Sequence, residues 1–246
     1  MIVLGIETSS LHGGVAVVGA EGLVAECILN LEVTYSERLL PAVERVLADA
    51  GLTVEDLGGL AVAIGPGSFT GLRIGLSTAK GLAAASGTPL VGVPTLKALA
   101  WSHPLSRYPI CPILDARKGE VYCAMFRWAH GEFEQVMADA ALPPAALAAR
   151  IAEPTLFVGD GVAAYGRFLA GALGPRAVFA PPSLSGARPV AVAALGRDRL
   201  LRGERDDPAA LVPSYLRPSE AELKRAAAAG APSAGAAAGR ATPAEP

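Results

Sequence analysis

A glycine-rich loop followed by a helical pattern is the first place in this sequence where chemistry could occur. The stretch GPGSFTG runs from Gly65 to Gly71, and the residues after it repeat with helical spacing. Free N–H groups and a positive dipole end at a helix N-terminus can face an anion such as a phosphate. Ser68 or Thr70 could cap the same N–H groups without a ligand. The loop therefore predicts either a phosphate site or a self-capped helix. It is neither a Walker A nor a GxGxxG loop.

Acidic residues beside turns form a second group of candidates. Glu7 is the one acid at the end of an apolar first strand, Asp160 lies between two glycines, and Asp115 precedes Arg117 in one turn. Together they could form a divided active site, or they could be turn-forming and surface charges. The candidate nucleotide-binding residues from the loop and the strand ends are Glu7, Ser9, Gly65, Gly67 and Asp160.

Histidine and cysteine do not form a metal-ligating pattern in the sequence. Each histidine stands alone, without an HxxxH or HExxH spacing, and the three cysteines are far apart and odd in number. We therefore predict no metal site and no disulfide framework, and we expect the cysteines to be buried packing residues. These residues are His12, His103, His130, Cys27, Cys111 and Cys123.

The helix after the loop carries two apolar faces. At about 100° per residue, Leu72, Leu76, Ala79 and Ala83 share one face, and Gly71, Gly75, Thr78 and Leu82 share a second, nearly smooth face. A glycine inside a helix costs ~1 kcal/mol relative to alanine, and very close packing against a neighbour recovers that cost. The smooth face thus predicts a tight contact, either within the chain or with a partner helix.

The elements that must position these residues alternate regularly. Short apolar runs bounded by turns predict buried strands, and periodic apolar stripes predict amphipathic helices. The resulting β-β-β-α-β-α-β-α order is typical of a mixed sheet with helices packed on it. The expected strands span residues 2–8, 14–18, 23–29, 60–64 and 89–93, and the expected helices span 34–51, 70–86 and 95–103.

A second series of the same kind begins near Ile110. Strands are predicted for ICPILDA, EVYCAMFRW, EFEQVMA and TLFVGDG, and helices for LPPAALAARIA, VAAYGRFLAGAL and RPVAVAALGRDRLLRGE. We expect an N-terminal lobe over residues 1–105 and a C-terminal lobe over residues 106–225, whose last helix could pack back on the first lobe. Residues 226–246 are mostly Ala, Gly and Pro, and we expect them to be disordered.

Composition and charge narrow the class of protein. Of the 246 residues, 52% are hydrophobic and 18% charged, which allows a sizeable core. No apolar run reaches the ~18 residues of a membrane span, and the N-terminus lacks a signal peptide's charged region, so we expect a cytoplasmic protein. A net charge of −2 does not suggest a dedicated nucleic-acid binder.

The charges are unevenly distributed along the chain. Residues 1–58 contain two Lys or Arg and nine Asp or Glu, whereas residues 59–130 contain seven Lys or Arg and two Asp or Glu. Such segregation could steer a partner, or the charges could mix on the folded surface.

Four motifs resemble the bacterial TsaB family, formerly YeaZ, of threonylcarbamoyladenosine biosynthesis proteins. They are GPGSFTGLRIGLSTAKGLA, LDARKGEVY, VGDG and PSYLR, and the likeness covers the chain from Met1 to about Arg217. The resemblance implies an α/β fold of the actin/hexokinase/Hsp70-like (ASKHA) type, with two related lobes that each contain a mixed sheet flanked by helices. Proteins of this fold usually place Asp at the end of the first strand, near the nucleotide phosphates or their metal. This chain has Glu7 there, which makes nucleotide binding in its own cleft more doubtful.

The resemblance also implies an accessory role in tRNA modification. TsaB-like proteins pair with a catalytic paralogue, TsaD, which carries a metal-binding HxxxH on the helix corresponding to residues 34–51. This chain has TYSERLLP there, without histidine. With the ATPase TsaE, the pair transfers a threonylcarbamoyl group to N6 of the adenosine 3′ of the anticodon in ANN-decoding tRNAs. The implied partners are TsaD-like and TsaE-like proteins, with tRNA reached indirectly and a homodimer formed when the chain is alone. No cofactor is expected on this chain alone, and ATP or ADP could lie at the complex interface.

The residues and the resemblance together leave three candidate functions. The leading one is a non-catalytic scaffold that activates the transferase, and the alternative is an independent ATP-dependent enzyme of the actin-like fold, such as a kinase or carbamoyltransferase. A metalloprotease is suggested only by older family names and lacks a ligand cluster. For the scaffold we predict a partner contact on the helix after the glycine loop and the helix before it. The predicted interface residues are Leu39, Leu40, Val43, Gly71, Ile74, Gly75, Thr78 and Leu82.

Overall fold

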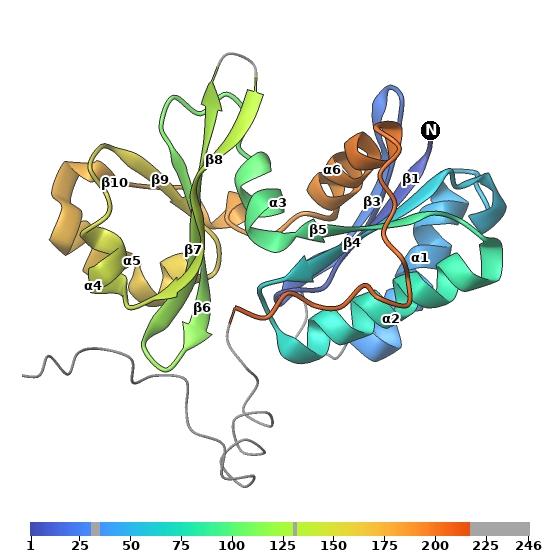
Figure 1. The fold of residues 1–246 in the computed structure, drawn as a ribbon, viewed down its shortest axis with the longest axis horizontal. Helices are drawn as coiled ribbons and strands as arrows, with labels where there is room; N and C mark the ends of the chain where they lie inside the picture. The colour runs from blue at the N-terminus through green and yellow to red at the C-terminus, as the bar shows by residue number, and fades with distance from the viewer. Residues whose placement is uncertain (31–34, 130–131, 217–246) are drawn as a thin grey trace, which may run out of the picture. The chain divides into compact units, whose positions relative to one another are not determined.

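The first half of the chain forms a five-stranded mixed sheet in the order β3-β2-β1-β4-β5 (Figure 1). Strand β1 pairs antiparallel with β2 and parallel with β4, which pairs parallel with β5. β1 is buried along its whole length, as its unbroken apolar run predicts. The structure, a computed structural model, describes residues 1–30, 35–129 and 132–216. The strands are β1 (Val3–Glu7), β2 (His12–Gly19), β3 (Gly22–Asn30), β4 (Gly59–Gly65) and β5 (Leu90–Pro94).

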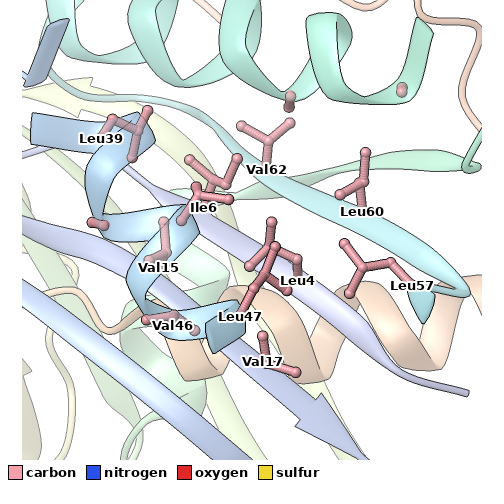
Figure 2. Close-up of a cluster of buried hydrophobic side chains, with 14 of the residues drawn as sticks. Leu4, Ile6, Val15, Val17, Leu39, Val46, Leu47, Leu57, Leu60 and Val62 are labelled. Atoms are coloured by element: carbon pink, nitrogen blue, oxygen red, sulfur yellow. The ribbon is translucent and has the colours of Figure 1, made fainter. Parts of the chain in front are cut away.

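Helices cover both faces of this sheet. α1 (Tyr35–Asp49) and α2 (Phe69–Ser86) pack on one face, and α6 (Pro189–Leu201) packs on the other. Figure 2 shows Leu39, Val46 and Leu47 of α1 gathered among side chains of the strands. The apolar stripe that predicted α1 is therefore the face that this helix buries in the lobe.

The second half repeats the same strand order, β8-β7-β6-β9-β10. Helices α4 (Pro144–Ala148) and α5 (Gly161–Leu173) contribute to the core on one face, and α3 (Thr95–Trp101) contributes Leu96 and Leu99 to the other core cluster. The strands are β6 (Ile110–Arg117), β7 (Glu120–Ala129), β8 (Glu132–Leu142), β9 (Thr155–Val158) and β10 (Ala177–Phe179). Short 3-10 turns span Val54–Asp56, Gly174–Arg176 and Pro182–Leu184.

Two sheets of identical strand order confirm the expected α/β fold with two related lobes. Every strand and helix predicted within the described residues is present, with ends that differ by a few residues. β10 was not predicted, because it has only three residues and follows a Gly-Pro turn. The predicted disordered tail, residues 226–246, lies outside the described residues, as does His130.

Candidate functional site

The candidate site is a cavity of about 700 Å³ between the two lobes. On the first lobe it is bounded by the turn after β1 and the N-terminus of α2, and on the second by the β6–β7 turn and the start of α5. The predicted residues Ser9, Gly67 and Asp160 line it. The position after a strand end and before a helix start is where open α/β sheets commonly bind ligands.

Ser9 lines the first-lobe side of the cavity, and Glu7 is buried behind it at the end of β1. Glu7 is completely buried, and Oε1 accepts a hydrogen bond of 2.6 Å from the backbone N–H of Ser9. Burial raises the pKa of Glu7 from 4.5 to about 7, against the lowering effect of the hydrogen bond from the Ser9 N–H. Glu7 Oε2 and Ser9 Oγ are both buried, and neither has a hydrogen-bond partner among the described residues. A carboxyl group in this state is only partly ionised at neutral pH.

Two backbone N–H donors of the glycine loop, those of Ser68 and Gly71, are bonded within the chain. Ser68 is the N-cap of α2, and its Oγ accepts a hydrogen bond of 3.2 Å from the Gly71 N–H. The Ser68 N–H donates to the Ser9 carbonyl at 2.6 Å. A Cβ at Gly67 would overlap the Ser9 backbone, and one at Gly65 would lie 2.9 Å from the Ser214 carbonyl oxygen. Of the two functions predicted for the loop, the geometry favours the self-capped helix.

The acids of the second lobe hold the β6–β7 turn. Asp115 Oδ1 accepts from the Arg117 N–H at 2.8 Å and from the Tyr165 hydroxyl at 3.3 Å. The Asp115 N–H donates to Asp160 Oδ1 at 3.1 Å, and loss of water around Asp160 raises its pKa. Arg117 has φ +62° and pairs with Asp115 at 3.3 Å. These contacts support the turn-forming role that the sequence left open beside a divided active site.

Gly71 and Gly75 of the predicted interface serve a different purpose. Both are buried, and a Cβ at either would overlap Thr8, at its carbonyl oxygen and Oγ1 respectively. The Thr8 hydroxyl donates to the Gly71 carbonyl at 2.8 Å. The two glycines therefore let α2 approach the end of β1 within the chain, and assigning them to a groove for a partner helix was wrong.

Leu39 and Val43 need the same correction. They are 1% and 2% exposed and belong to the core beneath α1, so they offer no area to a partner. Leu40, by contrast, is 51% exposed. Ile74 and Leu82 are half-buried at the edge of the same core, and Thr78 is half-buried on α2. The predicted interface residues that keep some exposed surface are Leu40, Ile74, Thr78 and Leu82, and we call them the α1–α2 face.

The sequence did not predict a side-chain cluster that joins two of its motifs. Phe69 and Tyr215 stack with ring centroids 5.4 Å apart, and the Arg73 guanidinium lies 3.8 Å over the Phe69 ring. Arg73 Nε also donates to the Tyr215 hydroxyl at 3.1 Å. The cluster ties the PSYLR motif to the glycine loop beside the cavity. In the sequence, the one indication of this cluster is that the glycine loop and the PSYLR motif each contain an aromatic residue, Phe69 and Tyr215.

The described residues contain neither a metal-ligating cluster nor a membrane-spanning helix. They contain no group of three or more His, Cys, Asp or Glu side chains placed to hold a metal ion. No helix among them is both long and apolar enough to cross a bilayer. All three cysteines are free thiols; Cys111 and Cys123 are buried as predicted, and Cys27 is half-buried.

Comparisons with known proteins agree on one group of relatives. A family model described as TsaD, tRNA N6-adenosine threonylcarbamoyltransferase, matches residues 31–225. The tRNA threonylcarbamoyladenosine biosynthesis protein TsaB of Bacillus subtilis is 35% identical over 91% of this chain and 97% of its own. TsaB of Escherichia coli is 40% identical over 40% of this chain and 46% of its own. The solved structure of YeaZ from Pseudomonas aeruginosa has a TM-score of 0.73 at 26% identity, over 87% of this chain and 99% of its own.

Proposed function

Because the chain belongs to the TsaB (YeaZ) family of tRNA threonylcarbamoyladenosine biosynthesis proteins, we propose that it acts in this pathway as a non-catalytic subunit that activates a TsaD-like transferase. The role in threonylcarbamoyladenosine biosynthesis follows from the near full-length match to TsaB of Bacillus subtilis, which is the observation that carries the proposal. The lack of a catalytic role and the identity of the partner are the parts to be tested.

The state of the cleft supports a role without catalysis. A nucleotide bound as in other proteins of this fold needs backbone donors for its phosphates and an ionised carboxylate for its metal. Here the Ser68 and Gly71 N–H groups are bonded within the chain, and Glu7 is buried with a pKa of about 7. These residues do not fit a phosphate–metal group.

The α1–α2 face is the surface we assign to the catalytic partner. Its apolar side chains come from two neighbouring helices, and Leu40 is half exposed in the isolated chain. A helix pair with an exposed leucine can add a partner's helices to its own packing and bury further apolar area. In the absence of the partner, two copies of this chain would use the same face symmetrically.

The remaining components belong to the complex. We assign ATP or ADP to the junction between this chain and its partner, with no cofactor or metal on this chain alone. A TsaE-like ATPase is the further partner, and tRNA is contacted through the complex. The charge segregation between residues 1–58 and 59–130 would then orient the chain in that assembly.

The test is co-purification with the TsaD-like protein of the same organism, followed by a threonylcarbamoyl transfer assay on an ANN-decoding tRNA. Leu40→Asp should weaken pairing at least about tenfold, because it places a charge in a contact that excludes water. Leu201→Asp is the matched control, since Leu201 is 55% exposed at the end of α6, away from α1 and α2.

Three outcomes decide between the parts of the proposal. Transfer activity of the isolated chain would contradict the non-catalytic role. Failure of the wild-type chain to pair would contradict the partner. Equal pairing by Leu40→Asp and Leu201→Asp would contradict the assignment of the α1–α2 face as the contact surface and leave the other two parts standing. In that case Thr78→Arg, on the neighbouring helix, should also pair normally.

A further inference from the structure

A second cavity, of about 540 Å³, lies apart from the candidate site and shares none of its lining residues. It is bounded by the end of β5 and the start of α3, by the β7–β8 hairpin, and by the last turns of α6. Its volume falls within the range of about 300–1,000 Å³ that is usual for small-molecule sites. We call it the tryptophan cavity, because both tryptophans of the chain, Trp101 and Trp128, line it.

The walls of the tryptophan cavity are aromatic. Trp128 and Phe133 pack with ring centroids 4.7 Å apart, and Phe133 in turn stacks on buried Phe126 at 5.2 Å. This layered packing holds Phe133 and Trp128 in fixed positions. Trp101 from α3 also lines the cavity, and Leu195 adds an aliphatic side chain. Such walls favour a large apolar group, because aromatic faces offer broad contact at little loss of conformational freedom.

Some charged side chains of the tryptophan cavity form ion pairs with each other, and for others the described residues offer no side-chain partner. Arg199 and Arg202 both pair with Glu204, at 2.6 and 2.9 Å, so these charges are already used. Lys97, Glu132 and Asp198 also line the cavity, and no side-chain partner is found for them among the residues that the structure describes. A space with aromatic side chains on its wall is therefore edged by Lys97, Glu132 and Asp198, whose charges have no side-chain partner in the part of the chain that the structure describes.

From these features we propose that the tryptophan cavity binds a free α-amino acid with a large apolar side chain, an aromatic one above all. A purely anionic molecule would meet the carboxylates of Glu132 and Asp198, and a purely cationic one would meet Lys97. A zwitterion satisfies both signs, with its carboxylate on Lys97 and its ammonium on Glu132 or Asp198.

The proposal can be tested without knowing the ligand's identity in the cell. Since both tryptophans line the cavity, the tryptophan emission of the full chain reports on this site directly. The probes are L-phenylalanine, 3-phenylpropionate and 2-phenylethylamine, which share a ring but carry both charges, the negative one or the positive one. We expect L-phenylalanine to change the emission saturably, and each analogue to bind at least about tenfold more weakly, as the loss of one charge-assisted contact implies.

Variants then separate the contacts of the two charges. Lys97→Met should weaken L-phenylalanine binding at least about tenfold and leave 2-phenylethylamine binding unchanged. The double variant Glu132→Gln, Asp198→Asn should weaken L-phenylalanine and leave 3-phenylpropionate unchanged. Lys80→Met on α2, which does not line the cavity, is the matched control.

Two results would overturn the proposal. One is the absence of a saturable emission change with L-phenylalanine at millimolar concentration. The other is equal binding of the three ring compounds, which would mean that the walls take up any apolar ring and that the charges do not select. Both results leave the proposed role in tRNA modification untouched, because that role depends on a different surface.

Discussion

Replacing Glu7 by Gln should remove a large part of the pH dependence of this protein's stability. Glu7 is completely buried, and its pKa is raised from 4.5 to about 7 mainly because burial disfavours the charged form. The folded chain therefore holds this proton more tightly than the unfolded chain does. The contribution of protonated Glu7 to the free energy of unfolding is fully present below pH 4.5. It decreases as the pH rises from about 4.5 to 7 and is lost above pH 7.

The size of the effect follows from that difference in pKa. At ~1.4 kcal/mol per pKa unit, the rise from 4.5 to about 7 corresponds to about 3 kcal/mol above pH 7, of which about 2.5 kcal/mol develops between pH 5 and pH 8. Gln has nearly the same shape, keeps an oxygen for the Ser9 N–H and does not titrate. At pH 8 the variant should therefore be more stable than the wild type, by about 5–10 °C in Tm for a chain of this size.

The assay is urea unfolding of the wild type and Glu7→Gln from pH 5 to pH 8. Glu21→Gln serves as the control, because Glu21 is exposed in the turn between β2 and β3. We expect the difference in unfolding free energy between wild type and Glu7→Gln to change by about 2–3 kcal/mol across this range. Parallel curves would refute the reasoning, since they would mean that Glu7 carries the same charge in the folded and unfolded chains.

Three further predictions follow from individual contacts. Gly75→Leu should lower Tm by several degrees, because its side chain would overlap Thr8, whereas Gly81→Leu on the open side of α2 should not; equal Tm values would contradict the close approach. The Cys111 thiol, whose pKa burial raises, should resist thiol reagents in the folded chain at pH 8 and react once the chain is unfolded in urea; rapid labelling before unfolding would count against it. Arg199→Met should lower stability by about 1–3 kcal/mol in urea unfolding, because two carboxylates and the Gly92 carbonyl lose their donor; an unchanged midpoint would show that water replaces it.

The sequence predicted the elements well because their signals are local. Unbroken apolar runs and helical stripes depend on neighbouring residues, so β1, α1 and the strands of the second half could be located. The capping of α2 was also within reach, since Ser68 stands at the position where an N-cap is expected. The matching strand order of the two sheets agrees with the fold that the motifs implied.

The candidate site was less predictable because its contacts join distant residues. Gly71 and Gly75 suggested close packing, but that the neighbour is Thr8, more than sixty positions away, depends on tertiary structure. The stripe of α1 likewise marked Leu39 and Val43 as apolar without showing which flank the lobe covers. Side chains that meet across 142 residues, such as Arg73 and Tyr215, leave no periodic pattern in either segment.

The exchange of helices between the two halves has a consequence for how the chain folds. α6 comes from the second half of the sequence but completes the core of the first sheet, while α3 comes from the first half and completes the core around β6 and β7. Each lobe therefore depends on a helix from the other half of the sequence to cover one face of its sheet. A cut at residue 105 would expose the face of the first sheet that α6 covers. We expect neither half to fold by itself, and we expect thermal unfolding to occur as one cooperative transition with equal calorimetric and van't Hoff enthalpies.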